Sequence, residues 1–327
     1  MKITNPEINK WSFYIRFKIS EPLGIDQNSI KFLDDFYIVS DSELPLKSSK
    51  ILKLKNSKPL IYRDICEVSK KVEQALLLAF TEIGIGIAYA ENLFSLKIID
   101  KLNNDVMNSF LKAHSTSNPY YYERPLIHLA NKFGVVLFDS ESQEWDSNAS
   151  QENEPRKVQD IEDVFSKCFH QVKQIDLFDE KFKKIEIATN ILSTSLFDDS
   201  LINRIILSMT SIEVLSNKIS RPETEIKVID RLIEKLHAMP DVNNQTKESL
   251  TKSIVSIKNQ SISKSCKLLI KQLLSKKDAE KFYQLYEFRS QIVHAGVLKD
   301  NKEMYEIYTD SYVLAKKVLE AYIIRNN

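Results

Sequence analysis

The stretch Tyr286–Gly296 reads YEFRSQIVHAG, and it ends a segment in which apolar residues recur every three or four positions. At 100° per residue, this spacing places one apolar stripe along an α-helix over 279–293. The residues of the stripe are Phe282, Leu285, Phe288 and Ile292. The stripe predicts a helix packed on a helical core, with Gly296 as the residue that stops it. Arg289 then lies beside the buried face.

Arg289 and His294 give this segment one fixed positive charge and one side chain that exchanges protons near neutral pH. Cleavage of RNA without a metal ion needs both, because imidazole transfers protons and guanidinium stabilises the phosphate whose charge grows in the transition state. Five residues turn an ideal helix through about 500°, which leaves the two side chains about 140° apart. Either the helix ends at this motif, or a second chain completes the site.

The order of these residues resembles a known motif. An aromatic helix enters it, and Arg, a small polar residue, three further residues, His and then Gly follow, as in the Rx4-6H motif of the HEPN superfamily. The sequence LYEFRSQIVHAG is most similar to the Apea-like HEPN branch. Two upstream stretches fit: LINRIILSMTSIEVLSNK (201–218), a long amphipathic helix with Glu213, and SIKNQSISKSCKLLI (256–270), a Lys/Ser-rich helix. The resemblance covers residues 180–325.

The resemblance implies a compact helical bundle that dimerises through the face carrying the motif. Many members of the superfamily are metal-independent endoribonucleases that act on tRNA, mRNA or phage transcripts. By this resemblance, His294 protonates the leaving 5′-oxygen, Arg289 neutralises the transition state, and Ser290 orients the phosphate or the histidine. Glu213 and Tyr286 are expected to support them. The products are a 2′,3′-cyclic phosphate and a 5′-hydroxyl, and DNA is not cut because it lacks the 2′-hydroxyl. No metal or other cofactor is expected.

Two other interpretations stay open. In the first, Arg289 pairs with a carboxylate such as Glu287 or Glu213 and His294 caps a helix end, so that the domain is a non-catalytic HEPN module. Such a module binds RNA, a nucleotide or a protein as a sensor or scaffold. In the second, the N-terminal half is the effector and the helical half is its dimerisation platform. Ser290 leaves these interpretations open, since many HEPN enzymes carry Asn, Asp or His after the arginine.

Positive charge is concentrated upstream of the motif. Residues 251–277 contain seven lysines and no acidic residue, and a polyanion would prefer such a strip. The residues expected to contact RNA are Lys258, Lys264, Lys267 and Lys271. The alternative is a solvated helix face. The expected partners are tRNA or mRNA and a second copy of the chain, and the family's association with toxin modules and anti-phage defence adds an operon-encoded partner or a phage trigger.

Composition excludes several classes of protein. The chain has 327 residues, which favours two domains. Its five glycines form neither GxxxxGK nor GxGxxG, so phosphate-binding loops of ATPases and dehydrogenases are absent from the sequence. Three scattered cysteines argue against a disulfide framework or a zinc site. No apolar run is long enough for a membrane span or a secretory signal, so a cytoplasmic location is expected.

The predicted organisation is an α+β N-terminal domain followed by an all-α HEPN-like helical bundle. Residues 1–138 form the first domain, with a sensor or regulatory role, and the acidic, polar stretch 139–157 is a linker. Strands are expected in WSFYIRFKI, DFYIVS, KILKLK, PLIYR and FGVVLFDS, and helices in 65–80 and around 101–114; 82–90 fits either. The helices expected in 158–327 are 161–171, 181–193, 201–218, 226–238, 247–258, 263–275, 279–293 and 302–323.

Overall fold

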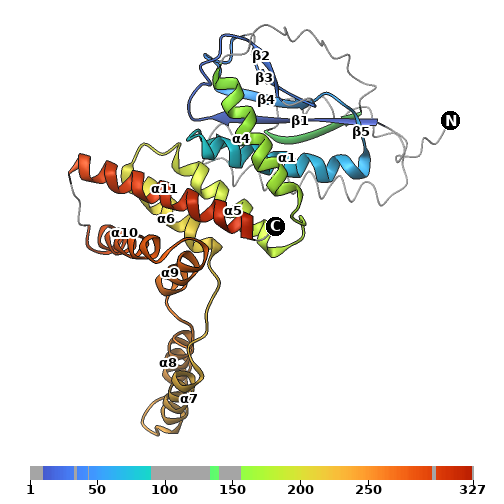
Figure 1. Cartoon of the computed structure of the whole chain (residues 1–327). Helices are drawn as coiled ribbons and strands as arrows, with labels where there is room; N and C mark the ends of the chain where they lie inside the picture. Colours follow the sequence, from blue (N-terminus) through green and yellow to red (C-terminus); the bar gives the residue numbers. More distant parts are fainter. Residues whose placement is uncertain are drawn as a thin grey trace, which may run out of the picture. The chain divides into compact units, whose positions relative to one another are not determined.

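The chain folds into two compact units that divide between Asp198 and Asp199 (Figure 1). The structure is a computed structural model, and it describes residues 10–32, 35–42, 44–89, 133–139, 156–296 and 300–325. The first unit combines a β-sheet with helices, and the second is helical, as the sequence predicted. The predicted helix around 101–114 and nearly all of the predicted linker lie outside the described residues.

Strand β1, Lys10–Ile19, is the centre of an antiparallel sheet and pairs with β4, β5, β6 and β7. Strand β3 joins β2 to β4, which extends the sheet on one side. The other strands are β2 (Ser29–Phe32), β3 (Phe36–Ser40), β4 (Ile51–Asn56), β5 (Leu60–Ile61), β6 (Ile87–Ala88) and β7 (Gly134–Asp139). The predicted strands are confirmed, except that PLIYR forms only the two-residue β5 before a helix begins.

Helices cover one face of this sheet. Helix α1, Tyr62–Glu82, places Phe80 edge-on against Phe17 of β1, with 5.7 Å between the ring centroids. Helix α4, Arg156–Lys173, places Phe165 against Phe36 of β3 at 6.3 Å. These aromatic contacts bury every second side chain of the strands, as a period of two residues requires. The odd-numbered residues of β1 from 13 to 19 are fully buried.

Helix α5, Glu180–Ser195, also belongs to the first unit. Thr189 accepts a hydrogen bond from Gln74 of α1 at 3.2 Å, and the backbone N–H of Ile87 in β6 donates to Ser193 Oγ at 2.7 Å. The segment 82–90, which fitted either a helix or a strand, therefore leaves α1 at Glu82 and adds β6 to the sheet. The division between the units falls after α5, well beyond the predicted linker at 139–157.

The second unit contains helix α6 (Leu201–Leu215) packed on α11 (Asn301–Arg325), with α9 (Ile262–Leu273) and α10 (Lys276–Ala295) beside them. Helices α7 (Glu223–Ala238) and α8 (Asn244–Ser256) lie side by side and project from this group (Figure 1). All eight helices predicted for 158–327 are present as α4 to α11. In the described parts of the chain, no helix has both the length and the apolarity needed to cross a bilayer.

One prediction in this unit is wrong. The stretch 256–270 is not a single Lys/Ser-rich helix, because α8 ends at Ser256 and α9 starts at Ile262. Between them the chain forms an antiparallel bridge from Asn259 to Ser220, and Gln260 N–H donates to the Ile219 carbonyl at 2.8 Å. These backbone bonds replace the helical ones and turn the chain back toward the core.

The substitution Phe80→Ala should destabilise the first unit by about 3–5 kcal/mol, because it removes a fully buried ring and leaves a cavity under β1. Both tryptophans of the chain, Trp11 and Trp145, lie in residues 1–198. Denaturant titration followed by tryptophan fluorescence therefore reports on this unit. Phe178 is the matched control, since its side chain is 97% exposed and Phe178→Ala should leave the titration unchanged. Equal effects of the two substitutions would contradict this packing.

Candidate functional site

Helix α10 carries the whole Arg-x4-His motif without a break. It begins at a cap in which Ser275 Oγ accepts the N–H of Asp278, and it ends at Gly296, which takes the left-handed conformation (φ 63°, ψ 20°) and donates to the Ile292 carbonyl at 3.1 Å. The predicted stop at Gly296 is confirmed. Because the helix continues past His294, Arg289 and His294 remain about 140° apart and about 7.5 Å apart along its axis.

The buried stripe of α10 places Arg289 beside α6. Phe282, Leu285, Phe288 and Ile292 are all less than a tenth exposed, as predicted. Arg289 Nη2 lies 4.0 Å from Glu213 Oε1, and both side chains are about one-fifth exposed. The guanidinium carbon lies 5.7 Å from the ring centroid of Tyr286. Three residues expected at the site, Arg289, Glu213 and Tyr286, therefore lie together.

The ion pair between Arg289 and Glu213 is loosely engaged. Its 4.0 Å separation exceeds hydrogen-bond length. Among the described residues, Arg289 Nε and Glu213 Oε1 are both buried without a hydrogen-bond partner. Burial and the charge of Glu213, which accepts a hydrogen bond from the Tyr286 hydroxyl, raise the pKa of Tyr286, while Arg289 opposes this rise. A buried donor and a buried acceptor thus remain unsatisfied side by side, which is uncommon in folded proteins.

Cys266 of α9 lies near the same carboxylate, a contact that sequence reasoning missed. Burial, with a further contribution from the charge of Glu213, raises the pKa of the Cys266 thiol to about 11, although a hydrogen bond with Ser216 at the end of α6 opposes the rise. Cys266 and Cys168 are buried, as expected for cysteines that act as small apolar residues, whereas Cys66 is half-buried. Cys266 therefore acts as a neutral packing residue at physiological pH.

His294 lies apart from this group. It is exposed in the last turn of α10, and Ser290 is half-buried one turn before it. Within one chain, the helix thus turns Arg289 toward α6 and leaves His294 at the surface. The geometry of a single chain does not bring the two side chains onto one phosphate.

The four lysines expected to contact RNA divide into two groups. Lys264, Lys267 and Lys271 follow one another on α9 at spacings of three and four residues, so they share one face of that helix. Lys267 Nζ lies 4.9 Å from the ring centroid of Tyr283 on α10, which links this stripe to the motif helix. Lys258 instead follows α8 and pairs with Asp230 of α7 at 2.5 Å. We call the first three residues the α9 lysine stripe.

Comparison of the chain with family models, curated proteins and solved structures gave no match. The resemblance to the HEPN superfamily therefore rests on the motif and the two upstream stretches. Within the described residues, no three His, Cys, Asp or Glu side chains are grouped as metal ligands would be.

Alkylation should separate the cysteines in the native protein. A pKa of about 11 in place of 9.0 lowers the thiolate fraction of Cys266 at pH 8 about a hundredfold, and burial slows its reaction further. Mass spectrometry after iodoacetamide treatment should find Cys66 modified first, with Cys266 modified only after unfolding. Rapid native labelling of Cys266 would contradict its placement against Glu213 and Ser216.

Proposed function

We propose that this protein is a metal-independent endoribonuclease of HEPN type that acts as a homodimer. The observation that carries the proposal is the state of Arg289. Among the described residues, its Nε–H has no hydrogen-bond partner, and its Nη2 lies 4.0 Å from Glu213 Oε1. A guanidinium held in place with unused donors is suited to a phosphate, which accepts several hydrogen bonds from it at once.

The reaction is attack of a ribose 2′-hydroxyl on the adjacent phosphodiester. Arg289 stabilises the charge that accumulates on the phosphate oxygens in the transition state. His294 donates a proton to the leaving 5′-oxygen, and Ser290 orients the phosphate or the imidazole by hydrogen bonding. Glu213 and Tyr286 hold the guanidinium in position before RNA binds. The bond to the 5′-oxygen breaks as the bond to the 2′-oxygen forms, which yields a 2′,3′-cyclic phosphate and a 5′-hydroxyl.

A second copy of the chain supplies the residue that one chain cannot place beside the phosphate. Because Arg289 and His294 diverge by about 140° on a continuous helix, one chain presents only half of a site. A two-fold axis beside α10 sets Arg289 of one protomer opposite the partner subunit's His294, and the same pairing recurs on the other side of the axis. The substrate is RNA, tRNA or mRNA, guided along the α9 lysine stripe. A role in anti-phage defence or as a toxin follows the family resemblance.

One observation favours a different function. The contact between Arg289 and Glu213 is the pairing expected of a structural arginine. On that basis, the domain is a non-catalytic module that binds RNA, a nucleotide or a protein as a sensor or scaffold. The two proposals differ on whether RNA is cut and on whether His294 matters for it.

Purified protein incubated with total tRNA and mRNA in EDTA should cut RNA and leave cyclic-phosphate ends. His294→Ala should lower the cleavage rate about 100-fold or more, because the leaving oxygen loses its proton donor. His237 of α7 is the control, since it is an exposed histidine outside the motif helix. His237→Ala should cut at the wild-type rate. RNA that is bound but never cut would favour the non-catalytic module.

Mixing two inactive variants tests the shared site. Arg289→Ala and His294→Ala should each be inactive alone. In a mixed dimer, one of the two sites combines an intact Arg289 with an intact His294, so random exchange should restore about a quarter of wild-type activity. The measurement is cleavage after the two variants are unfolded together and refolded, with each variant refolded alone as the control. Absence of recovery in mixed dimers that are shown to form would rule out a site divided between protomers.

A further inference from the structure

The α7–α8 hairpin exposes several large apolar side chains. It projects from the other helices of the second unit (Figure 1), and the residues it buries are Ile229 and Leu236 of α7. Further apolar side chains of the hairpin are between 43% and 57% exposed, namely Val228, Leu232, Met239, Leu250, Val255 and Ile257. Where such side chains are contiguous on a protein surface, they mark a site of interaction.

On α7, three of these side chains form one line. At 100° per residue, Val228, Leu232 and Met239 fall within about 40° of one another. This line lies about 70° to one side of Ile229 and Leu236, which are buried in the contact with α8. Helix α7 therefore has a second apolar stripe beside the one that packs on α8.

On α8, Leu250 and Ile257 extend this stripe. They are seven residues apart and lie within about 20° of each other. They also lie about 80° to one side of Lys247, Thr251 and Ile254, the half-buried residues that face α7. The rotation has the same sense on both helices, and in an antiparallel pair this directs both stripes to one side of the hairpin. We call Val228, Leu232, Met239, Leu250 and Ile257 the apolar face.

Polar contacts join the two helices on the other side of the hairpin. Asp230 pairs with Lys258, and the Thr251 hydroxyl lies 3.0 Å from His237 Nε2. By the same geometry, Asp230 and His237 lie about 100° from the buried line of α7, in the sense opposite to the apolar face. Val255 of α8 lies on this polar side as well. The two sides of the hairpin therefore differ in chemistry.

Two cations border the apolar face. Arg231 and Lys235 lie one turn apart on α7, within about 80° of its exposed apolar line, and both are exposed. Lys227, one turn before Arg231, pairs with Glu223 at 2.8 Å. Within the part of the chain that the structure describes, Arg231 and Lys235 have no such ion pair.

The carboxylates of the hairpin do not balance these two cations. Asp230, Glu234 and Glu248 lie on the polar side by helical geometry. Glu225 is nearer to the apolar face, but it pairs with Arg221 at 2.9 Å. The apolar face is thus bordered by positive charge that is open to a ligand.

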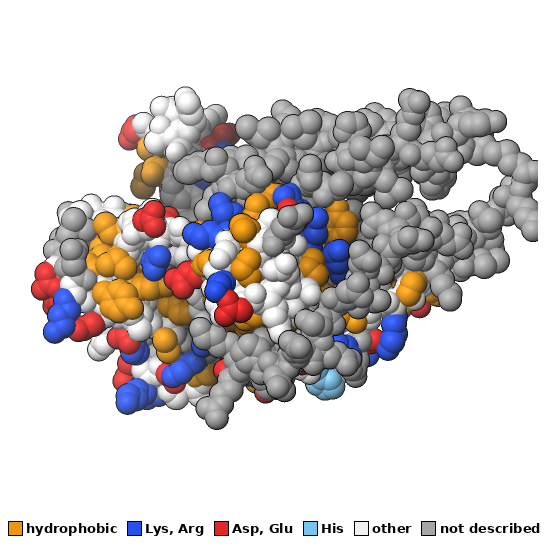
Figure 2. Space-filling model, turned by 90° about the horizontal axis from the view of Figure 1, so that it is seen from above, with side chains coloured by type: hydrophobic (Ala, Val, Ile, Leu, Met, Phe, Trp, Pro, Cys, Tyr) orange, Lys and Arg blue, Asp and Glu red, His pale blue; other side chains and the backbone are white. Residues whose placement is uncertain are grey.

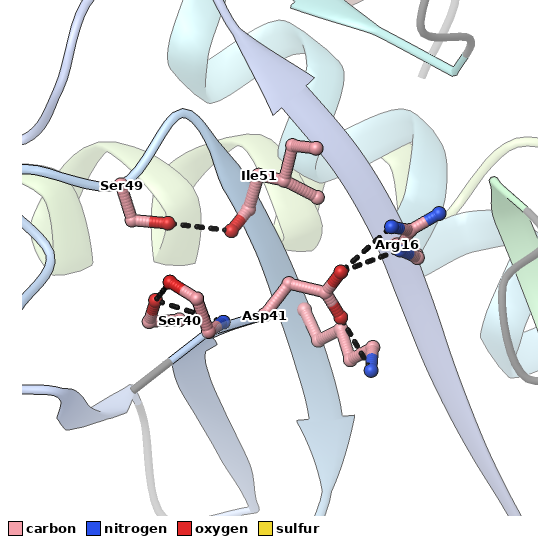
Figure 3. Close-up of polar contacts among 7 residues, drawn as sticks. Arg16, Ser40, Asp41, Ser49 and Ile51 are labelled. Carbon is pink, nitrogen blue, oxygen red and sulfur yellow. Dashed lines mark hydrogen bonds and ion pairs between the residues drawn. The ribbon is translucent and has the colours of Figure 1, made fainter. Parts of the chain in front are cut away.

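Cations of the N-terminal unit show the alternative arrangement. Asp41 Oδ2 accepts hydrogen bonds from Arg16 Nε at 2.9 Å and Nη2 at 2.7 Å, and its Oδ1 pairs with Lys53 (Figure 3). Figure 2 also shows Lys and Arg side chains mixed with Asp and Glu on one face of the molecule. A ligand that brings carboxylates to Arg231 and Lys235 would give the hairpin the same pairing.

We propose that the apolar face of the α7–α8 hairpin binds an amphipathic helix of a partner protein, with carboxylates on that helix beside its own apolar stripe. The face runs about 16 Å from Val228 to Met239, which is the length of a helix of about three turns. The groove between two packed helices accepts the side chains of a third. The partner's carboxylates meet Arg231 and Lys235, so that charge complementarity orients the helix.

Other occupants fit this surface less well. A second copy of the hairpin brings the same cations and an apolar face without a free carboxylate, so its charges do not complement those of the first. Helices that lie in a membrane interface carry Trp or Phe on their apolar side, whereas residues 221–260 contain no aromatic Trp, Phe or Tyr. The surface does not depend on the proposed nuclease activity.

A designed peptide tests this surface on the full-length protein. The probe is a fluorescein-labelled helix of roughly 18 residues, long enough to be helical when bound, with leucines every three or four positions and glutamates beside them. A second peptide has lysine in place of every glutamate, and a third has the acidic composition in permuted order. Fluorescence anisotropy should show micromolar binding of the acidic helix, with both other peptides binding at least tenfold more weakly.

Variants of the hairpin locate the binding site. Leu250→Glu should weaken binding of the acidic peptide about tenfold or more, because it places a charge in the apolar contact. Val255→Glu is the matched control, since Leu250 and Val255 are both 43% exposed but lie on opposite sides of α8. It should bind as wild type. The double variant Arg231→Glu with Lys235→Glu should prefer the lysine peptide to the acidic one, and this reversal cannot come from misfolding.

Several outcomes would overturn the proposal. These are failure of wild-type protein to bind the acidic peptide, equal binding of the permuted peptide, and equal effects of Leu250→Glu and Val255→Glu. A lower molar mass of Leu250→Glu alone, by light scattering, would assign the face to a second copy of the chain. Sedimentation with vesicles of phosphatidylglycerol and phosphatidylcholine that Leu250→Glu abolishes would assign it to a membrane. None of these results bears on RNA cleavage, which His294→Ala tests separately.

Discussion

The two-residue period of β1 determines both faces of the N-terminal sheet. This strand pairs with four others, so its register sets which side chains of the sheet are buried against α1 and α4. Phe13, Ile15 and Phe17 lie inside, and Arg16 and Lys18 are placed on the opposite face. A slip of one residue would exchange the two sets and bury charges against Phe80. The packing of the helices and the charge pattern of the outer face are therefore consequences of one strand.

Much of this architecture could be predicted from the sequence because it depends on periodicity. The alternation in β1, the stripe of α10 and the stop at Gly296 are local patterns, and each was confirmed. The division between units was not predictable, because an amphipathic helix such as α4 or α5 has the same pattern whether it packs on a sheet or on a bundle. At the site, helical geometry placed Arg289 beside the buried face, but the choice of Glu213 over Glu287 depends on how α6 packs against α10. Nothing in the sequence near Cys266 indicated its contact with Ser216.

Each unit contains an arginine that faces a carboxylate, and the two pairs differ in their distances and hydrogen bonds. Arg16 and Asp41 share two short hydrogen bonds, and Lys53 occupies the other oxygen. Arg289 Nη2 and Glu213 Oε1 lie 4.0 Å apart, and within the described part of the chain Arg289 Nε and Glu213 Oε1 have no hydrogen-bond partner. A hydrogen-bonded ion pair such as Arg16–Asp41 resists rearrangement, because breaking it leaves an uncompensated charge in the low-dielectric interior. In the Arg289–Glu213 pair, buried polar atoms already lack hydrogen bonds, so part of this free-energy cost is present before any partner binds. Arg289 therefore exchanges partners more readily than Arg16.

The α7–α8 hairpin departs from the other helices of the second unit at Ser220 and rejoins them at Asn259, and these two residues pair with each other. The two ends of the hairpin are therefore held together by backbone pairing, whatever the length of the helices between them. Helix α8 contributes no buried residue, and α7 contributes only Ile229 and Leu236. Few core contacts constrain its sequence or length, so a longer or shorter hairpin would leave the helices around Arg289 unchanged. The length of the hairpin is thus uncoupled from the geometry of the helices around Arg289.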